Sequence, residues 1–177
     1  MKVLVTGGAG FIGSNLVDSL IDKGHEVLIV DNLSTGKKEN LNPRAKFFEL
    51  DITDKKLSEI FEKNKPEAVF HLAAQIDITK SVQYPVWDAE QNILGSINVL
   101  ENAKENKVKK VIFASSAAVY GDTDQLPTPE GHPTLPPSPY GIGKLTVEKY
   151  LDYYYQTFKL PYIALRYANV YGPRQSA

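Results

Sequence analysis

The stretch "VTGGAGFIG", residues 5–13, decides the fold. It contains the spacings Gly8-x-Gly10-x-x-Gly13 and Gly7-x-x-Gly10-x-x-Gly13, and it joins a β-branched run to a segment with helical periodicity. Glycines at these positions allow a tight turn and a close approach of the backbone to a pyrophosphate, which the helix N-terminus attracts. The spacing alone is a weak signal. Between a strand and a helix it favours a dinucleotide-binding loop over a turn that only packs helix on strand.

Short apolar runs alternate with helical segments along the rest of the chain. The runs are almost continuously apolar, as expected for parallel strands that helices cover on both faces. We expect strands at "KVLVT" (2–6), "EVLIVD" (26–31), "AKFFELD" (45–51), "EAVFHLA" (67–73), "KKVIFASS" (109–116) and "PYIALRYANV" (161–170). Helices are expected over residues 11–23, 54–64, 89–106 and 139–158. The alternation predicts an α/β fold: a Rossmann-type doubly wound parallel sheet with strand order 3-2-1-4-5-6, forming one domain over residues 1–177.

The composition restricts the classes of partner and chemistry. The 177 residues, 42% of them hydrophobic, suffice for one domain with a substantial core. The formal charge is −1 with both signs interspersed, so no basic patch predicts nucleic acid or a membrane surface as a partner. The chain has no cysteine, which excludes disulfides, thiolate catalysis and sulfur-bound metals, and we predict no metal site. The opening apolar run, "MKVLVTGG", is too short for a signal peptide or a membrane span, so a cytoplasmic location is expected.

An acidic residue ends the second expected strand. Asp31 follows the glycine loop by about twenty residues, where a carboxylate can accept hydrogen bonds from a ribose diol and would repel a 2′-phosphate. This position predicts NAD rather than NADP as the cofactor. The alternative is that Asp31 is only a turn residue at a strand end.

Other strand ends face the same expected crevice. Asp51 and Ile52 could contact adenine, but it is about equally consistent that Asp51 begins a turn and Thr53 caps the next helix. His71 has no carboxylate or metal-ligand neighbour in sequence. It is therefore interpreted as a packing residue at a strand end rather than an acid or base.

The stretch "SPYGIGKLTVEKY", residues 138–150, places a tyrosine and a lysine on one helix face. Ser138 suits the cap and Pro139 the first turn, so Tyr140 and Lys144 lie at i and i+4. By spacing alone, an ordinary exposed pair is the commoner meaning. The loop before it, "LPTPEGHPTLPPSP", holds six of the eleven prolines and is interpreted as a rigid connection that fixes the start of this helix.

Together, these motifs resemble a known family. The glycine loop, "DNLSTG", "LDIT", "HLAAQ", "SSAAVYG", "YGIGK" and "RYANVYGPR" occur in order, and this set is similar to the extended short-chain dehydrogenase/reductase family. Within it, the chain is most similar to the NAD-dependent nucleotide-sugar epimerases of the UDP-glucose 4-epimerase type. The resemblance covers essentially the whole chain, and the combination of glycine loop, Tyr-x-x-x-Lys and upstream serine is far more specific than any one motif.

The resemblance implies a set of cofactor and substrate contacts. Those to the pyrophosphate would be Gly7, Gly10, Phe11 and Ile12; to the adenosine ribose, Asp31, Asn32, Ser34, Thr35 and Gly36; to adenine, Asp51 and Ile52; to the nicotinamide half, Leu72, Ala73, Ala74, Asn92, Ala114 and Tyr167; and to the sugar nucleotide, Asn169. For Asn92 a buried helix-to-strand hydrogen bond is a close alternative, and for Asn169 a turn role is another.

The resemblance also implies catalytic roles. Tyr140 would be the acid/base that removes the sugar 4-hydroxyl proton while hydride leaves C4 for NAD, and the transient 4-keto sugar would take the hydride back on its other face. Lys144 would bind the nicotinamide ribose, and its charge, with that of oxidised nicotinamide, would lower the pKa of Tyr140. Ser116 would align the reacting hydroxyl. Ser115 is the alternative, disfavoured only by family register.

Other functions within and outside this family remain alternatives. Sugar-nucleotide dehydratases and decarboxylases of the family carry an acid after the catalytic Ser or Thr, whereas this chain reads Ser116-Ala117-Ala118. A non-catalytic dinucleotide-binding module would lack the tyrosine or the lysine. The family continues beyond Ala177 into a region that holds a UDP-sugar, so we expect this chain to bind NAD with little epimerase activity alone. A homodimer through residues 89–106 and 139–158 is a further expectation from the family.

Overall fold

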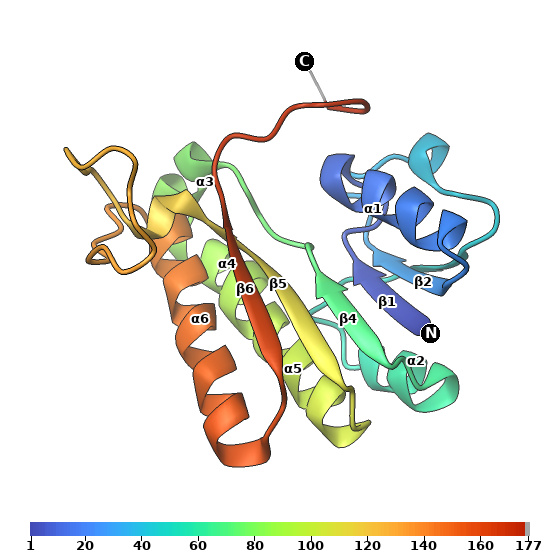
Figure 1. Cartoon of the computed structure of the whole chain (residues 1–177). Coiled ribbons are helices and arrows are strands. Elements are labelled where there is room, and N and C mark those ends of the chain that lie inside the picture. The colour runs from blue at the N-terminus through green and yellow to red at the C-terminus, as the bar shows by residue number, and fades with distance from the viewer. Residues whose placement is uncertain (176–177) are drawn as a thin grey trace.

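The computed structural model describes residues 1–175 and contains a six-stranded sheet in the order β3-β2-β1-β4-β5-β6. Every adjacent pair is parallel. The expected Rossmann-type doubly wound sheet and its strand order are confirmed (Figure 1). The strands are β1 (Lys2–Thr6), β2 (Glu26–Asp31), β3 (Lys46–Glu49), β4 (Ala68–His71), β5 (Lys110–Ser116) and β6 (Tyr162–Tyr167).

The helices differ from the sequence prediction at three places, one of which is an unpredicted short helix over residues 78–83. They are α1 (Phe11–Asp22), α2 (Leu57–Asn64), α3 (Ile78–Gln83), α4 (Pro85–Ala89), α5 (Gly95–Glu105) and α6 (Pro139–Phe158), with 3₁₀ turns η1 (Lys38–Asn40) and η3 (Ala117–Val119) and a π-helical turn η2 (Glu90–Leu94). The predicted helix over 54–64 begins three residues later. Helical structure is present over nearly all of the predicted 89–106 range, but it begins earlier, at Pro85, and contains a π turn between α4 and α5.

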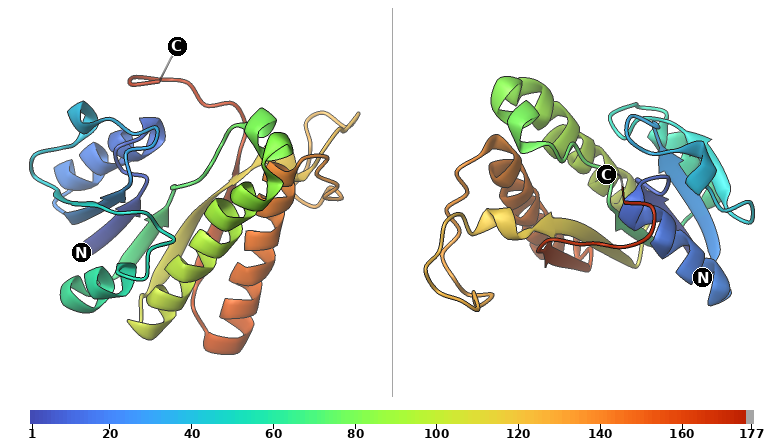
Figure 2. Two further views of the ribbon diagram at one scale, coloured as in Figure 1. Left: turned by 180° about the vertical axis from the view of Figure 1, so that it is seen from behind. Right: turned by 90° about the horizontal axis from the view of Figure 1, so that it is seen from above.

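Helices cover both faces of the sheet and bury two apolar clusters. On one face, α1 residues Val17, Leu20 and Ile21 pack on β1 and β2. On the other, α2, α5 and α6 bury the larger cluster against the same strands and against β4 and β5 (Figure 2). Strands β1 and β2 are therefore buried on both sides, which explains their continuous apolar runs. Burial alternates along β5 and β6, and Ile163 and Leu165 of β6 are exposed.

The carboxyl ends of the strands meet at one edge of the sheet. The strand order reverses at β1, which pairs with β2 on one side and with β4 on the other. In open α/β sheets, ligands bind at such a reversal, outside the carboxyl ends of the strands. After β6 the chain runs across this edge toward α1 (Figure 1).

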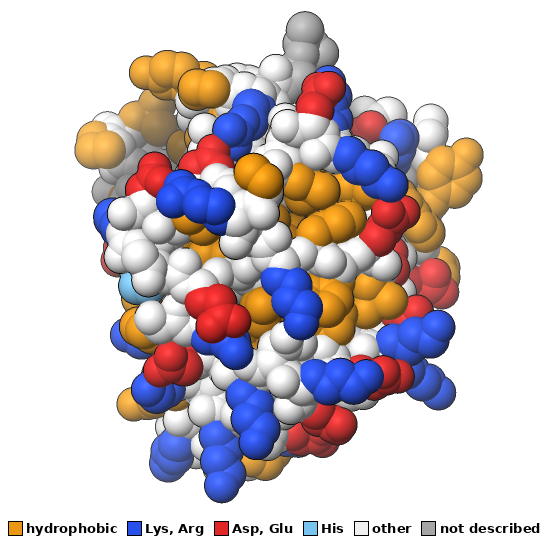
Figure 3. Space-filling model, turned by 90° about the vertical axis from the view of Figure 1, so that its right-hand side faces the viewer, with side chains coloured by type: hydrophobic (Ala, Val, Ile, Leu, Met, Phe, Trp, Pro, Cys, Tyr) orange, Lys and Arg blue, Asp and Glu red, His pale blue; other side chains and the backbone are white. Residues whose placement is uncertain are grey.

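Over the residues that the structure describes, no helix is long and apolar enough to cross a membrane, and no group of three or more His, Cys, Asp or Glu side chains could hold a metal. On the side of the molecule that carries α1 and β2, basic and acidic side chains are interspersed among apolar ones (Figure 3). That face therefore has no basic stripe of the kind that binds nucleic acid.

Candidate functional site

The glycine loop turns from β1 into α1 in a way that only glycine permits. Gly7 has φ +73°, and a Cβ there would lie 2.7 Å from the backbone nitrogen of Ala73. A Cβ on Gly13 would collide with the carbonyl oxygen of Gly7. Gly10 precedes the helix without a side-chain cap, and no acidic residue lies in the first turn. The first amide groups of α1 are thus left for an anion at the reversal point of the sheet.

Asp31 holds this loop from the end of β2. Its Oδ2 accepts a hydrogen bond from the Ala9 backbone at 2.9 Å, and its Oδ1 accepts one from the Leu33 backbone at 2.8 Å. The turn role that the sequence left open is therefore present. Each carboxylate oxygen keeps a further lone pair that could accept a ribose hydroxyl. A Cβ on Gly36 would lie 2.8 Å from Oδ1, so this glycine lets its loop pass directly over the carboxylate.

Asp51, at the end of β3, forms a turn of its own. Its Oδ1 accepts from both the backbone nitrogen and the hydroxyl of Thr53, and its Oδ2 accepts from Asn32 at 2.7 Å. Burial tends to raise the pKa of Asp51, but these hydrogen bonds outweigh burial and hold it below its usual value. Asp51 therefore begins a turn, as one alternative expected. The idea that Thr53 caps the next helix is wrong, since α2 starts only at Leu57, with Lys56 in the cap position.

Tyr140 and Lys144 lie together beneath the carboxyl end of β5. Lys144 is only 4% exposed, so the pair is not an ordinary exposed helix face. Its Nζ donates to the Ala114 carbonyl at 2.8 Å and lies 5.8 Å from the centroid of the Tyr140 ring. Ser138 caps α6 by accepting a hydrogen bond from the Gly141 backbone, as the sequence predicted.

Burial shapes the titration of both groups. It lowers the pKa of Lys144 to about 8, while the Asp88 carboxylate acts in the opposite direction. Burial also raises the pKa of Tyr140, with Asp88 adding to the rise and a hydrogen bond with the Ser116 side chain opposing it. In the protein alone, therefore, the pKa of Tyr140 is not lowered. The lowering expected from the sequence required the charge of oxidised nicotinamide as well as that of Lys144. That lowering has to come from charge added to the site.

The two serines at the end of β5 have different partners. The Ser115 hydroxyl is buried and donates to Glu148 Oε1 at 2.5 Å. Glu148 also holds Arg166 through two hydrogen bonds, of 3.0 and 2.7 Å. The Ser116 hydroxyl accepts from the Ala118 backbone at 3.1 Å and acts on Tyr140. This difference supports Ser116 as the serine available to a substrate.

Asn92 and His71 both have structural partners. Asn92 is buried, and its amide accepts from the Gln75 backbone nitrogen at 2.8 Å and donates to the Gln75 carbonyl at 3.0 Å. Asn92 therefore makes buried structural hydrogen bonds, but to the loop after β4 and not to a strand as the sequence alternative expected. A nicotinamide contact of Asn92 stays a prediction. His71 lies between the hydroxyls of Thr6 and Ser96, at 2.7 and 2.8 Å. Burial lowers its pKa to about 3, as expected of a neutral packing residue.

The remaining predicted contact residues lie at or near the same edge of the sheet. Six are half-buried, at the start of α1 or at strand ends: Phe11, Ile12, Leu72, Ala73, Ala74 and Tyr167. Four are exposed loop residues: Asn32, Ser34, Thr35 and Asn169. One, Ile52, is buried behind the site. Ile52 packs against Gly95, where a Cβ would come within 2.7 Å of its Cδ1.

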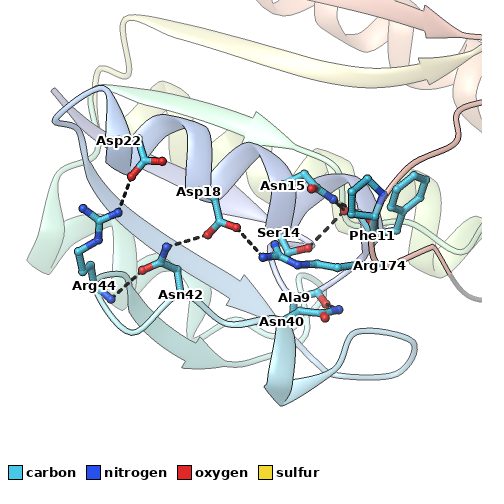
Figure 4. A network of polar contacts seen from close by, with 11 residues as sticks. Ala9, Phe11, Ser14, Asn15, Asp18, Asp22, Asn40, Asn42, Arg44 and Arg174 are labelled. Carbon is cyan, nitrogen blue, oxygen red and sulfur yellow. Dashed lines mark hydrogen bonds and ion pairs between the residues drawn. The ribbon is translucent and has the colours of Figure 1, made fainter.

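Two features near this site were not predicted from the sequence. One is a network on α1, in which Asp18 binds Arg174 and Asn42, and Asn15 binds the Pro173 carbonyl (Figure 4). No local pattern could have shown it. The other is Asp88, whose spacing of four residues before Asn92 was a readable signal that both lie on one helix face.

Comparison with known proteins places these features in context. A family model described as the NAD dependent epimerase/dehydratase family matches residues 3–177. The chain is 44% identical to a UDP-glucose 4-epimerase of Mycolicibacterium smegmatis, over 99% of this chain and 58% of that protein.

Two solved structures are also very similar. One is a UDP-glucose 4-epimerase of Thermotoga maritima with UDP-glucose, at a TM-score of 0.97 and 51% identity over 99% of this chain and 58% of that chain. The other is the Thermus thermophilus UDP-glucose 4-epimerase in complex with NAD, with a TM-score of 0.97 and 45% identity over 99% of this chain and 58% of that chain. The chain thus spans little more than half the length of these proteins.

Proposed function

The chain belongs to the NAD-dependent epimerase/dehydratase family, and from this premise we propose that it supplies the NAD-binding and catalytic part of a UDP-sugar 4-epimerase. The observation that carries the proposal is the convergence of Ser116, Tyr140 and buried Lys144 at the edge of the sheet where the glycine loop lies. In this proposal residues 1–177 form one NAD-binding domain. UDP-glucose and UDP-galactose are the proposed substrate pair, since a very similar solved structure holds UDP-glucose.

The residues present fit NAD. The loop from β1 to α1 would receive the pyrophosphate through the uncapped amides that follow Gly10. The Asp31 carboxylate, fixed by two backbone amides, would bind the adenosine ribose. Lys144, with its Nζ on the Ala114 carbonyl, has donors left for the nicotinamide ribose. When bound, NAD supplies the acceptor and then the donor of the hydride at sugar C4.

The proton steps belong to the protein. The Tyr140 hydroxyl would take the proton of the sugar 4-hydroxyl as the carbonyl forms, and would return it when the carbonyl is reduced. The Ser116 hydroxyl would hydrogen-bond the same oxygen and fix its direction relative to Tyr140. The ammonium of Lys144 would stabilise the phenolate form of Tyr140, since its Nζ is close to that ring.

The family's other reactions fit this chain less well. Ala117 and Ala118 follow Ser116, so no acid is placed there for the additional proton transfer of a dehydratase or decarboxylase. A non-catalytic module would not need Lys144 buried beside Tyr140. A homodimer through residues 89–106 and 139–158 is also proposed, and exposed apolar side chains on these segments, such as Leu94, Ile142 and Tyr153, support it.

Calorimetric titration of this chain with NAD and NADP, combined with a UDP-galactose conversion assay on the same sample, tests the proposal. We expect NAD binding and little conversion, because the distant binding energy that positions the sugar in the longer relatives would be missing. Mass spectrometry of the denatured protein would identify any cofactor that co-purifies. Failure to bind NAD would contradict the proposed site. Full turnover would contradict the proposal that this chain supplies only the NAD-binding and catalytic part of the enzyme.

A further inference from the structure

Asp88 is a buried carboxylate behind the Tyr140 and Lys144 pair that the proposed reaction does not use. It is 1% exposed and lies in α4, one turn after Pro85. Buried carboxylates are costly unless partners compensate for the lost water. Its position therefore needs a reason.

The carboxylate joins two segments of the site. Its Oδ1 accepts from the Gln75 side chain at 2.9 Å and from the Asn92 side chain at 3.0 Å. Gln75 belongs to the loop after β4, and Asn92 to the π turn that follows α4. Because Asn92 also binds both backbone groups of Gln75, the three residues form one closed network.

The other carboxylate oxygen faces α6 between the two proposed catalytic residues. A Cβ on Gly143 would lie 3.7 Å from Asp88 Oδ2, and Gly143 stands directly before Lys144. Of the charged groups on the elements around Lys144, Asp88 is the one whose charge acts on both Lys144 and Tyr140. Besides Tyr140, His71 on β4 is a titratable group whose charge would interact with Lys144, and it is buried and neutral.

We propose that Asp88 is a positioning residue, which holds Lys144 in its charged form beside Tyr140 and ties the Gln75 loop to the helix that carries Asn92. Without a compensating charge, burial of Lys144 favours the neutral amine, and a neutral amine cannot stabilise a phenolate. Asp88 and Asn92 lie four residues apart on one helix face, which is the face toward Gln75. The consequence for catalysis depends on the proposed function, whereas the interaction with Lys144 does not.

The test measures the pH midpoint of the Lys144 titration by NMR in the NAD-free protein labelled with ¹³C-lysine. The signal of Lys144 is assigned by its disappearance in Lys144→Met. We expect a midpoint near pH 8 in the unaltered protein and a lower midpoint in Asp88→Asn. The matched control is Asp77→Asn, which removes one charge from the neighbouring loop and keeps a residue that can cap α3. It should leave the midpoint in place.

Each result bears on the proposal. If Asp88→Asn does not fold, Asp88→Ser gives the same measurement with a hydroxyl left to accept from Asn92. A Lys144 midpoint that is unchanged in a folded Asp88 variant would overturn the proposal, as would an equal shift in Asp77→Asn. Calorimetry of the unaltered protein with NAD is run alongside. If the unaltered protein does not bind NAD, the proposed function is contradicted, whereas the result on Asp88 and Lys144 still holds.

Discussion

The guanidinium of Arg174 lies across helix α1 on Asp18, with Nη2 2.6 Å from Oδ2, although the two residues are 156 positions apart. The side chain of Asn15 donates to the Pro173 carbonyl at 3.0 Å (Figure 4). A Cβ on Gly172 would lie 3.5 Å from the Phe11 ring, so this residue is also next to the start of α1. The segment after β6 is thus fastened to the first turns of the helix whose N-terminus would receive the pyrophosphate.

Arg174→Ala should therefore speed the release of NAD. A partly exposed ion pair of this kind contributes up to about 1 kcal/mol, which corresponds to about a fivefold change in rate. Stopped-flow displacement of bound NAD measures it. Arg44→Ala is the matched control, because Arg44 pairs with Asp22 on the same helix at 2.5 Å and does not fasten the segment. Equal effects of the two variants would show that the contact of Arg174 with Asp18 does not itself slow the release of NAD.

Asp31 should set the preference for NAD over NADP. A carboxylate beside a 2′-phosphate costs at least about 1 kcal/mol by like-charge repulsion, so NAD should bind at least about fivefold more tightly. Asp31→Asn should narrow that ratio. It should also cost about 1–2 kcal/mol of stability, because the amide oxygen cannot replace both acceptors of the Ala9 and Leu33 amides.

Calorimetric titration of each variant with both cofactors gives the ratio. The control is Asp51→Asn, which changes the charge at the end of the neighbouring strand β3. A ratio that moves equally in both variants would show that general charge, and not the place of Asp31, decides the preference.

Tyr140→Phe should retain NAD and lose at least about a hundredfold in kcat, the usual range for removal of a general acid/base. The assay requires a chain with a complete UDP-sugar-binding region. Turnover close to that of the unaltered protein would remove Tyr140 from the mechanism.

The two serines should separate in the same assay. Ser116→Ala should lower kcat, because its hydroxyl faces Tyr140, and should cost only about 1 kcal/mol of stability through loss of the hydrogen bond from the Ala118 backbone. Ser115→Ala should instead lower the free energy of unfolding by about 1–3 kcal/mol, since it removes a buried partner of Glu148. The reverse pattern in urea denaturation and kinetics would exchange their roles.

His71 should make stability depend on pH. Its pKa falls from 6.5 to about 3 on folding, so the unfolded chain binds a proton that the folded chain does not. The free energy of unfolding is therefore unaffected by His71 protonation above pH 6.5. As the pH falls from 6.5 toward 3, it decreases by up to about 1.4 kcal/mol per pH unit. Urea denaturation between pH 7.5 and 5 measures the slope.

His71→Gln should be less stable at pH 7.5 and should have a flatter profile below pH 6.5. His25→Gln, immediately before β2, is the matched control for the loss of a histidine. An unchanged slope in His71→Gln would mean that other groups carry the pH dependence.

The fold and much of the candidate site follow from the sequence. The glycine spacing after a β-branched run, the apolar strands and the Ser138-Pro139 start of α6 are local patterns, and each acts on backbone within a few residues. Parallel strands then bring their ends to one edge, so Asp31, Ser116 and the start of α6 could be expected near one another. The boundaries of β1, β2 and α6 agree with the predicted ranges for the same reason.

Other features were settled only by the tertiary structure. One is the hydrogen bond of Ser115, and not Ser116, to Glu148. The others are the π turn that joins α4 to α5, the burial of Lys144 near Asp88, and the contact of Arg174 with Asp18. Each depends on how closely residues distant in sequence approach, which is set by packing across the whole sheet. Burial is likewise a property of the assembled fold. Tyr140 and Lys144 have a spacing that any helix could contain, and it is the burial of Lys144 that makes its charge depend on the buried carboxylate of Asp88.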